Sequence, residues 1–221
     1  MEAVLKVGGS LIEHPSELKA LCKTLSSLAK THKISVVPGG GVFADMVRKV
    51  DEEWKLSETT AHKMAVLAMD QYGLFLSDIT PNSQVCYCLE DVKSARQGLL
   101  PIILPSQYIF CEDPLEHSWD VTSDSIAAYI AGVLKAEKLV LVTDVDGIYE
   151  DNPRKNPDAK LVKQLTAKQL LSWNKRTSVD KALPNLLIKF KLNCYVVNGM
   201  HPERVCAILA NRKSVYTCII P

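Results

Sequence analysis

The chain has 221 residues and a formal charge of +1, from 26 Lys+Arg against 25 Asp+Glu, and this length suits one large α/β unit with an ample core. No basic stripe with interleaved aromatic residues appears and the longest apolar runs are of strand length, so neither nucleic acid nor a membrane is an expected partner. The seven cysteines are odd in number and the chain reads directly into a strand without a secretory signal, which favours reduced thiols in a cytoplasm.

Strand-like and helix-like patterns alternate along the chain, as expected of a mainly parallel sheet covered by helices on both faces. We predict strands over residues 2–7, 34–38, 85–89, 100–104, 138–143, 193–197 and 215–220. Helices are predicted over 15–30, 42–53, 61–76, 123–134, 179–190 and 202–210, with a small one between 89 and 100. The expected fold is a three-layer αβα sandwich around an open, mainly parallel sheet. No linker divides it, so we treat residues 1–120 and 121–221 as two lobes of one unit.

Two glycine clusters each follow an apolar strand directly. The first is Gly8-Gly9-Ser10 and the second is Gly39-Gly40-Gly41. Glycine lets backbone N–H groups turn toward an anion, and a helix that begins there adds the positive end of its dipole. Lys6 brings a cation to the same strand end. These features predict a site that moves a phosphoryl group.

Two other phosphate-binding motifs fit these glycines less well. The P-loop sequence G-x-x-x-x-G-K-[ST] is absent from the chain. Residues 39–44 fit the dinucleotide fingerprint G-x-G-x-x-A, but that motif requires a second strand ending in an acidic residue about 20 positions on. Residues 58–69 instead have a helical pattern, which argues against a dinucleotide site.

Three further motifs complete a pattern. They are Thr122-Ser123-Asp124-Ser125-Ile126-Ala127-Ala128, Thr143-Asp144-Val145-Asp146-Gly147-Ile148-Tyr149 and Ser178-Val179-Asp180-Lys181. With the two glycine clusters, and in this order, they resemble the amino-acid kinase family over nearly the whole chain. The family includes carbamate, acetylglutamate, aspartate, uridylate and isopentenyl phosphate kinases.

The resemblance implies an ATP-dependent phosphotransferase with Mg²⁺ on the nucleotide phosphates, no evident protein ligand for the metal, and a homo-oligomeric state. Residues 1–120 would form the acceptor-side lobe and 121–221 the nucleotide-side lobe of a single kinase domain. The residues implied in catalysis are Lys6, Asp124 and Lys181, with Asp124 orienting both lysines. Nucleotide contacts are expected from Gly8, Gly9, Ser10, Thr143, Asp144, Asp146, Gly147, Tyr149, Asn152 and Pro153.

Each of these residues also has a simpler interpretation. Lys181 alone would be an ordinary surface lysine of a helix, and Lys6 one whose stem packs on apolar surface. Asp124 could be a first-turn acid favoured by the helix dipole. Asp144 and Asp146 could be turn formers, because Asp-Gly is a common turn pair.

The acceptor is predicted from departures within the family. The chain has no histidine shortly after the acceptor glycines, unlike isopentenyl phosphate kinases, and it lacks the usual opening of uridylate kinases. It most resembles the small archaeal and methylotroph kinases of methanofuran biosynthesis, which phosphorylate an aminomethyl-furanmethyl phosphate to the diphosphate. Gly39, Gly40, Gly41, Asp45 and Asp120 are the predicted acceptor contacts, with Asp70 a further candidate for the ammonium. Another kinase of the family, or a non-catalytic anion-storage protein of the same fold, is the alternative.

Overall fold

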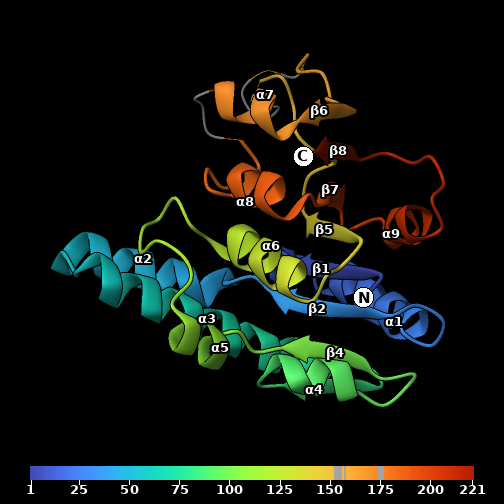
Figure 1. Ribbon diagram of the computed structural model, residues 1–221, viewed down its shortest axis with the longest axis horizontal. Coiled ribbons are helices and arrows are strands. Elements are labelled where there is room, and N and C mark those ends of the chain that lie inside the picture. The colour runs from blue at the N-terminus through green and yellow to red at the C-terminus, as the bar shows by residue number, and fades with distance from the viewer. Residues whose placement is uncertain (152–155, 157, 174–176) are drawn as a thin grey trace.

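The computed structural model describes residues 1–151, 156, 158–173 and 177–221 (Figure 1). Within these ranges a single eight-stranded sheet runs in the order β3-β4-β2-β1-β5-β7-β8-β6. Its strands are β1 (Ala3–Val7), β2 (Ile34–Pro38), β3 (Ser83–Cys86), β4 (Leu100–Ile103), β5 (Lys138–Thr143), β6 (Gln164–Thr166), β7 (Asn193–Asn198) and β8 (Thr217–Ile220). Neighbouring strands are parallel except for β7 and β8, which are antiparallel.

Helices cover both faces of this sheet. They are the 3-10 helix η1 (Gly9–Glu13) and the α-helices α1 (Pro15–Leu28), α2 (Gly41–Trp54), α3 (Glu58–Ile79), α4 (Leu89–Ser94), α5 (Ser106–Glu112), α6 (Ser123–Val133), α7 (Ala167–Ser172), α8 (Leu183–Phe190) and α9 (Pro202–Leu209). Successive residues of β1 point to opposite faces, so Leu5 packs with α1 and α9 while Val4 packs with α6 and α8. The expected three-layer αβα sandwich is confirmed.

Most predicted elements occur within a few residues of their expected ends, and two differ for identifiable reasons. The strand expected at 85–89 lies at Ser83–Cys86, because the Asp91 carboxylate accepts the N–H groups of Tyr87 and Cys88 and starts α4 there. The helix expected from Val179 begins at Leu183, whose N–H donates to the Asp180 carboxylate at 2.8 Å. The short elements η1, α5, β6 and α7 were not predicted.

The order of the strands determines where a ligand can bind. β1 pairs with β2 on one side and with β5 on the other, and all three are parallel, so their carboxyl ends lie at one edge. The chain first continues to one side of β1 and later returns to the other, which makes β1 a topological switch point, where open α/β sheets bind ligands. The hairpin of α2 and α3 projects from the sheet beyond this edge (Figure 1).

The loops after β1 and β2 are in contact through their backbones. A Cβ atom added to Gly9 would lie 2.0 Å from the nitrogen and 2.2 Å from the Cα of Gly41. Gly41 itself has φ of +54°, a left-handed conformation that favours glycine. No side chain fits at Gly9. Glycine is therefore required at position 9 for a steric reason and favoured at position 41 for a conformational one.

We therefore expect Gly9→Ala to lower the free energy of unfolding by about 3 kcal/mol, because backbone atoms must separate to admit the methyl group. Gly98→Ala is the control: its φ is +86° but nothing lies within 4 Å of the added Cβ, so a loss of about 1 kcal/mol is expected. Urea unfolding of both variants measures the difference. Equal losses would contradict the backbone contact as the cause.

Candidate active site

An ion pair between β1 and α6 lies at the carboxyl edge of the sheet. Lys6 Nζ of β1 is 2.9 Å from Asp124 Oδ1, in the first turn of α6. Their side chains are 13% and 9% exposed, so the pair is largely shielded from water. The sequence placed both residues in one site, and the structure brings them together.

A second carboxylate, from Asp180, supports this pair. Its backbone N–H donates to Asp124 Oδ2 at 3.2 Å. Its own carboxylate accepts five hydrogen bonds of 2.6–3.0 Å, from the N–H groups of Thr122, Ser125 and Leu183 and the hydroxyls of Thr122 and Ser125. Burial and the Asp124 charge raise the pKa of Asp180, whereas the donors favour its ionised form. Asp180 therefore joins the starts of α6 and α8, a role that the sequence analysis missed.

Lys181 lies apart from the Lys6–Asp124 pair. Its Nζ is 2.9 Å from Asp120 Oδ1 and 3.3 Å from Oδ2, and both side chains are more than half exposed. Lys181 therefore pairs with Asp120 and not with Asp124. Of the two predicted catalytic lysines, only Lys6 pairs with Asp124. An exposed ion pair of this kind is weak, so little free energy is needed to move Lys181 to another anion.

The glycine loops offer fewer free amides than their sequence suggests. The Gly8 N–H donates to the Val142 carbonyl at 2.7 Å, and the Gly39 N–H donates to the Val7 carbonyl at 2.8 Å. The buried Tyr72 hydroxyl donates to the Gly8 carbonyl at 3.2 Å and ties α3 to the same loop. The amides of Gly8 and Gly39 thus extend the sheet, and the adjacent cavity is lined by Gly8, Gly9, Ser10, Gly40 and Gly41.

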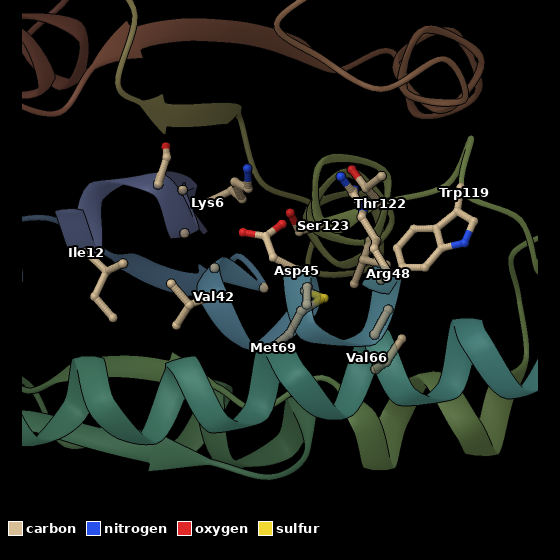
Figure 2. Close-up of a pocket in the computed structure, with 18 of the residues that line it drawn as sticks. Lys6, Ile12, Val42, Asp45, Arg48, Val66, Met69, Trp119, Thr122 and Ser123 are labelled. Carbon is tan, nitrogen blue, oxygen red and sulfur yellow. The ribbon is translucent and has the colours of Figure 1, made fainter. Parts of the chain in front are cut away.

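This first cavity, of about 290 Å³, lies between the glycine loops, α2, α3 and the start of α6. In Figure 2 Lys6 lies toward one end and Trp119 with Arg48 toward the other, with Val66 and Met69 of α3 along the floor. The Asp45 side chain points from α2 into the cavity (Figure 2). No residue in the described ranges forms an ion pair or hydrogen bond with the Asp45 carboxylate, in contrast to Asp124 and Asp180.

Asp70, the further candidate for the ammonium, has a different environment. It accepts hydrogen bonds from the N–H and hydroxyl of Ser106, at the start of α5. Burial raises the pKa of Asp70, partly offset by those two bonds. Asp70 does not line the cavity, and its contacts are those of a helix cap.

A second cavity, of about 540 Å³, adjoins the first on the side of residues 177–181. Arg48, Trp119 and Thr122 line both cavities, so they form the shared wall. The Trp119 ring has the Arg48 guanidinium carbon 4.7 Å from its centre, and its Nε1 donates to Asp51 at 2.8 Å. Asp120, Asp124, Asp180 and Lys181 contribute to the second cavity.

The motif after β5 is held mainly by protein contacts. Asp146 accepts from Asn198 at 3.0 Å and pairs with Arg204 of α9. Burial alone would raise the pKa of Asp146, but Asn198 and the Arg204 charge outweigh it and lower the pKa. A Cβ on Gly147 would lie 2.4 Å from Thr217 Oγ1, so this turn packs tightly on β8.

The remaining residues of that motif have separate positions. The Thr143 hydroxyl donates to Asp144 at 3.1 Å and Thr143 also lines the first cavity. Tyr149 forms an isolated bridge with Leu161. Asn152 and Pro153 lie outside the described residues. Across the part of the chain that the structure describes, no three His, Cys, Asp or Glu side chains form a group that could hold a metal ion, and no helix is long and apolar enough to span a bilayer.

Comparison with known proteins agrees with this geometry. The model of the amino acid kinase family matches residues 1–198. The [5-(aminomethyl)furan-3-yl]methyl phosphate kinase of Methanocaldococcus jannaschii is 38% identical over 98% of this chain and 97% of its own. A uridylate kinase of Methanococcus aeolicus is 29% identical over 97% of each chain. The crystal structure of the Archaeoglobus fulgidus uridylate kinase covers 99% of this chain and 100% of its own, with a TM-score of 0.78 and 24% identity.

An open, mainly parallel sheet with two glycine loops and a shielded lysine at its switch point, in a chain that is similar to kinases over nearly its whole length, defines a phosphotransferase. More particularly, the chain belongs to the amino acid kinase family.

Proposed function

We propose that this protein transfers the γ-phosphoryl group of ATP to the phosphate of [5-(aminomethyl)furan-3-yl]methyl phosphate, giving a diphosphate, as a step of methanofuran biosynthesis. The observation that supports this choice of acceptor is the unpaired Asp45 carboxylate in the cavity beside Lys6. A primary ammonium needs such a partner, whereas Asp124 and Asp180 already have protein partners. The relative at 38% identity supports the same acceptor.

In this mechanism an acceptor phosphate oxygen attacks the γ-phosphorus, and the bond from that phosphorus to the ADP oxygen breaks. The attacking oxygen is already anionic near neutral pH, so no general base is required. Lys6 stabilises the charge on the transferring group, and Asp124 holds the Lys6 ammonium in place. Gly9, Ser10, Gly40 and Gly41 surround the phosphates. Lys181 leaves Asp120 to meet the nucleotide phosphates.

The second cavity and the turn after β5 are the proposed nucleotide side. Thr143, Asp144, Asp146, Gly147, Tyr149, Asn152 and Pro153 are proposed to contact ATP there. Mg²⁺ fits this donor set only as an ion held mainly by phosphates and water, because the described residues contain no group of three ligands. When bound, Mg²⁺ neutralises phosphate charge. The lobes 1–120 and 121–221 would then be the acceptor and nucleotide sides of one kinase domain.

A homo-oligomeric, cytoplasmic protein is part of this proposal. Leu67 and Leu74 lie seven residues apart on α3 and are 46% and 50% exposed, with Lys63 and Asp78 beyond them. An antiparallel pair of α3 helices would bury the leucines and bring each Lys63 toward the partner's Asp78. The seven free cysteines are consistent with a reducing compartment.

Replacing Lys6 with methionine is expected to lower turnover by roughly 10³-fold or more while the protein stays folded, because the transferring group loses its cation. Lys181→Met should have an effect of the same order. Lys168→Met, on the exposed surface of α7, is the control. Coupled-assay turnover and thermal melting measure both properties, and near-normal turnover of folded Lys6→Met would defeat the mechanism.

Asp124→Asn should reduce kcat more than it raises KM, since it loosens Lys6 without removing it. An effect confined to KM would count against this positioning role.

The furan phosphate should be a better acceptor than UMP or isopentenyl phosphate, as judged by kcat/KM. Asp45→Asn should raise the KM for the amine-bearing acceptor about 10-fold or more, with little change for ATP or for a deaminated analogue. Glu13→Gln is the matched control, because Glu13 is another exposed carboxylate of the same cavity. Comparable kcat/KM for UMP and the furan phosphate would refute the acceptor assignment, and a larger effect at Glu13 would refute the role of Asp45.

Leu67→Glu with Leu74→Glu should convert the protein to monomer, because two charges would enter the proposed α3 contact. Val215→Glu, at an exposed apolar position outside that helix, should leave the assembly intact. Sedimentation velocity measures the mass of each variant. A wild-type monomer would exclude the proposed oligomer.

A further inference from the structure

Two histidines stack where the first cavity meets the segment 113–122. The ring centres of His62, on α3, and His117 are 4.6 Å apart and their planes are inclined by 19°. His117 is fixed on its other sides, since its Nε2 is 2.7 Å from Asp113 Oδ1 and its Nδ1 is 3.0 Å from Thr59 Oγ1. The stacked ring of His117 therefore constrains the plane of the His62 ring.

His62 lines the first cavity although its residue is only 7% exposed. Within the described ranges no residue makes a hydrogen bond to either ring nitrogen of His62. Its ring can therefore form hydrogen bonds only with something that enters the space beside it. This separates His62 from Asp124, Asp180 and Asp70, whose polar atoms are satisfied by the protein.

The environment of His62 favours the neutral ring. Burial lowers the pKa of His62, and His117 and Lys63 lower it further, while Asp113 opposes them. A neutral imidazole has one N–H donor and one acceptor nitrogen, so it recognises hydrogen-bonding groups and not charge. The charged residues that line the cavity, Lys6, Glu13, Asp45 and Arg48, come from β1, η1 and α2.

The surroundings of His62 have the shape and polarity that suit a flat ring. The Trp119 indole lines the same end of the cavity, where Asp51 and Arg48 hold it. Val66 and Met69 add apolar floor (Figure 2). An aromatic wall, an apolar floor and one neutral hydrogen-bonding edge match a planar ring that carries a heteroatom.

We propose that His62 is a specificity-determining residue that hydrogen-bonds the heteroaromatic ring of the phosphate acceptor, with Trp119 as the adjoining wall. The inference rests on the proposed function in one respect, namely that a phosphate-bearing acceptor occupies the first cavity. A ringless acceptor such as isopentenyl phosphate offers His62 no hydrogen-bonding group, so His62 discriminates against it.

His62→Phe keeps a flat ring on the His117 stack and removes both nitrogens. With the furan phosphate we expect kcat/KM to fall about 10-fold or more, mostly through KM, because the ring loses its hydrogen bond. The KM for ATP and the kcat/KM for isopentenyl phosphate should change by less than about twofold. His62→Gln, which restores a donor and an acceptor, should recover part of the loss. His117→Phe, which keeps the stack, should change the acceptor preference less than His62→Phe.

Each result decides the inference. An equal loss with ring-bearing and ringless acceptors would mean that His62 only packs, and no loss would mean that it does not contact the ring. If the wild type uses UMP in place of the furan phosphate, the proposed function fails, and the same comparison of UMP with isopentenyl phosphate still tests His62. A wild type that prefers isopentenyl phosphate, or calorimetry that detects neither ring-bearing acceptor, overturns the inference.

Discussion

The backbone contact between the loops after β1 and β2 is the constraint on which the site depends. Neighbouring parallel strands lie about 4.8 Å apart, so loops that leave them at the same edge meet unless side chains separate them. Gly9 and Gly41 have no side chain, and their atoms touch. The start of α2 and the end of β1 are therefore held together, and Tyr72 adds α3 through the Gly8 carbonyl. The first cavity exists because these three elements cannot move apart independently.

The buried carboxylates of Asp124 and Asp180 hold β1, α6 and α8 together. Asp180 satisfies donors from both α6 and α8, and through its own N–H it orients Asp124. Asp124 in turn fixes Lys6, which lies on β1. An unpaired carboxylate at this depth would be costly. The number of donors around Asp180, and the cation at Asp124, explain why two acids can lie side by side there.

The sequence predicted what depends on local pattern and strand order. The alternation of strands and helices gave the layers, and the ends of β1 and β2 gave the two glycine loops, whereas the proximity of Lys6 to Asp124 was implied by the family resemblance. Contacts between distant segments could not be predicted in this way. Three such contacts depend on how the elements pack. They are the hydrogen bond from the Gly8 N–H to Val142, the ion pair of Lys181 with Asp120 and the stack of His62 on His117. The role of Asp180 at the start of α8 could have been predicted, because an acid three residues before an apolar helix is a typical helix-start signal.

The two parts of the site are carried by different kinds of element. Lys6 and Asp124 stand on a central strand and on the helix packed against it, whereas Asp45, His62 and Trp119 come from the α2–α3 hairpin and the segment before α6. Substitutions on the hairpin can reshape one wall without disturbing the sheet. With this arrangement the specificity for a small phosphorylated acceptor can change during evolution while the residues of phosphoryl transfer stay the same. Relatives named for a furan phosphate and for uridylate on one common fold are the expected outcome of that history.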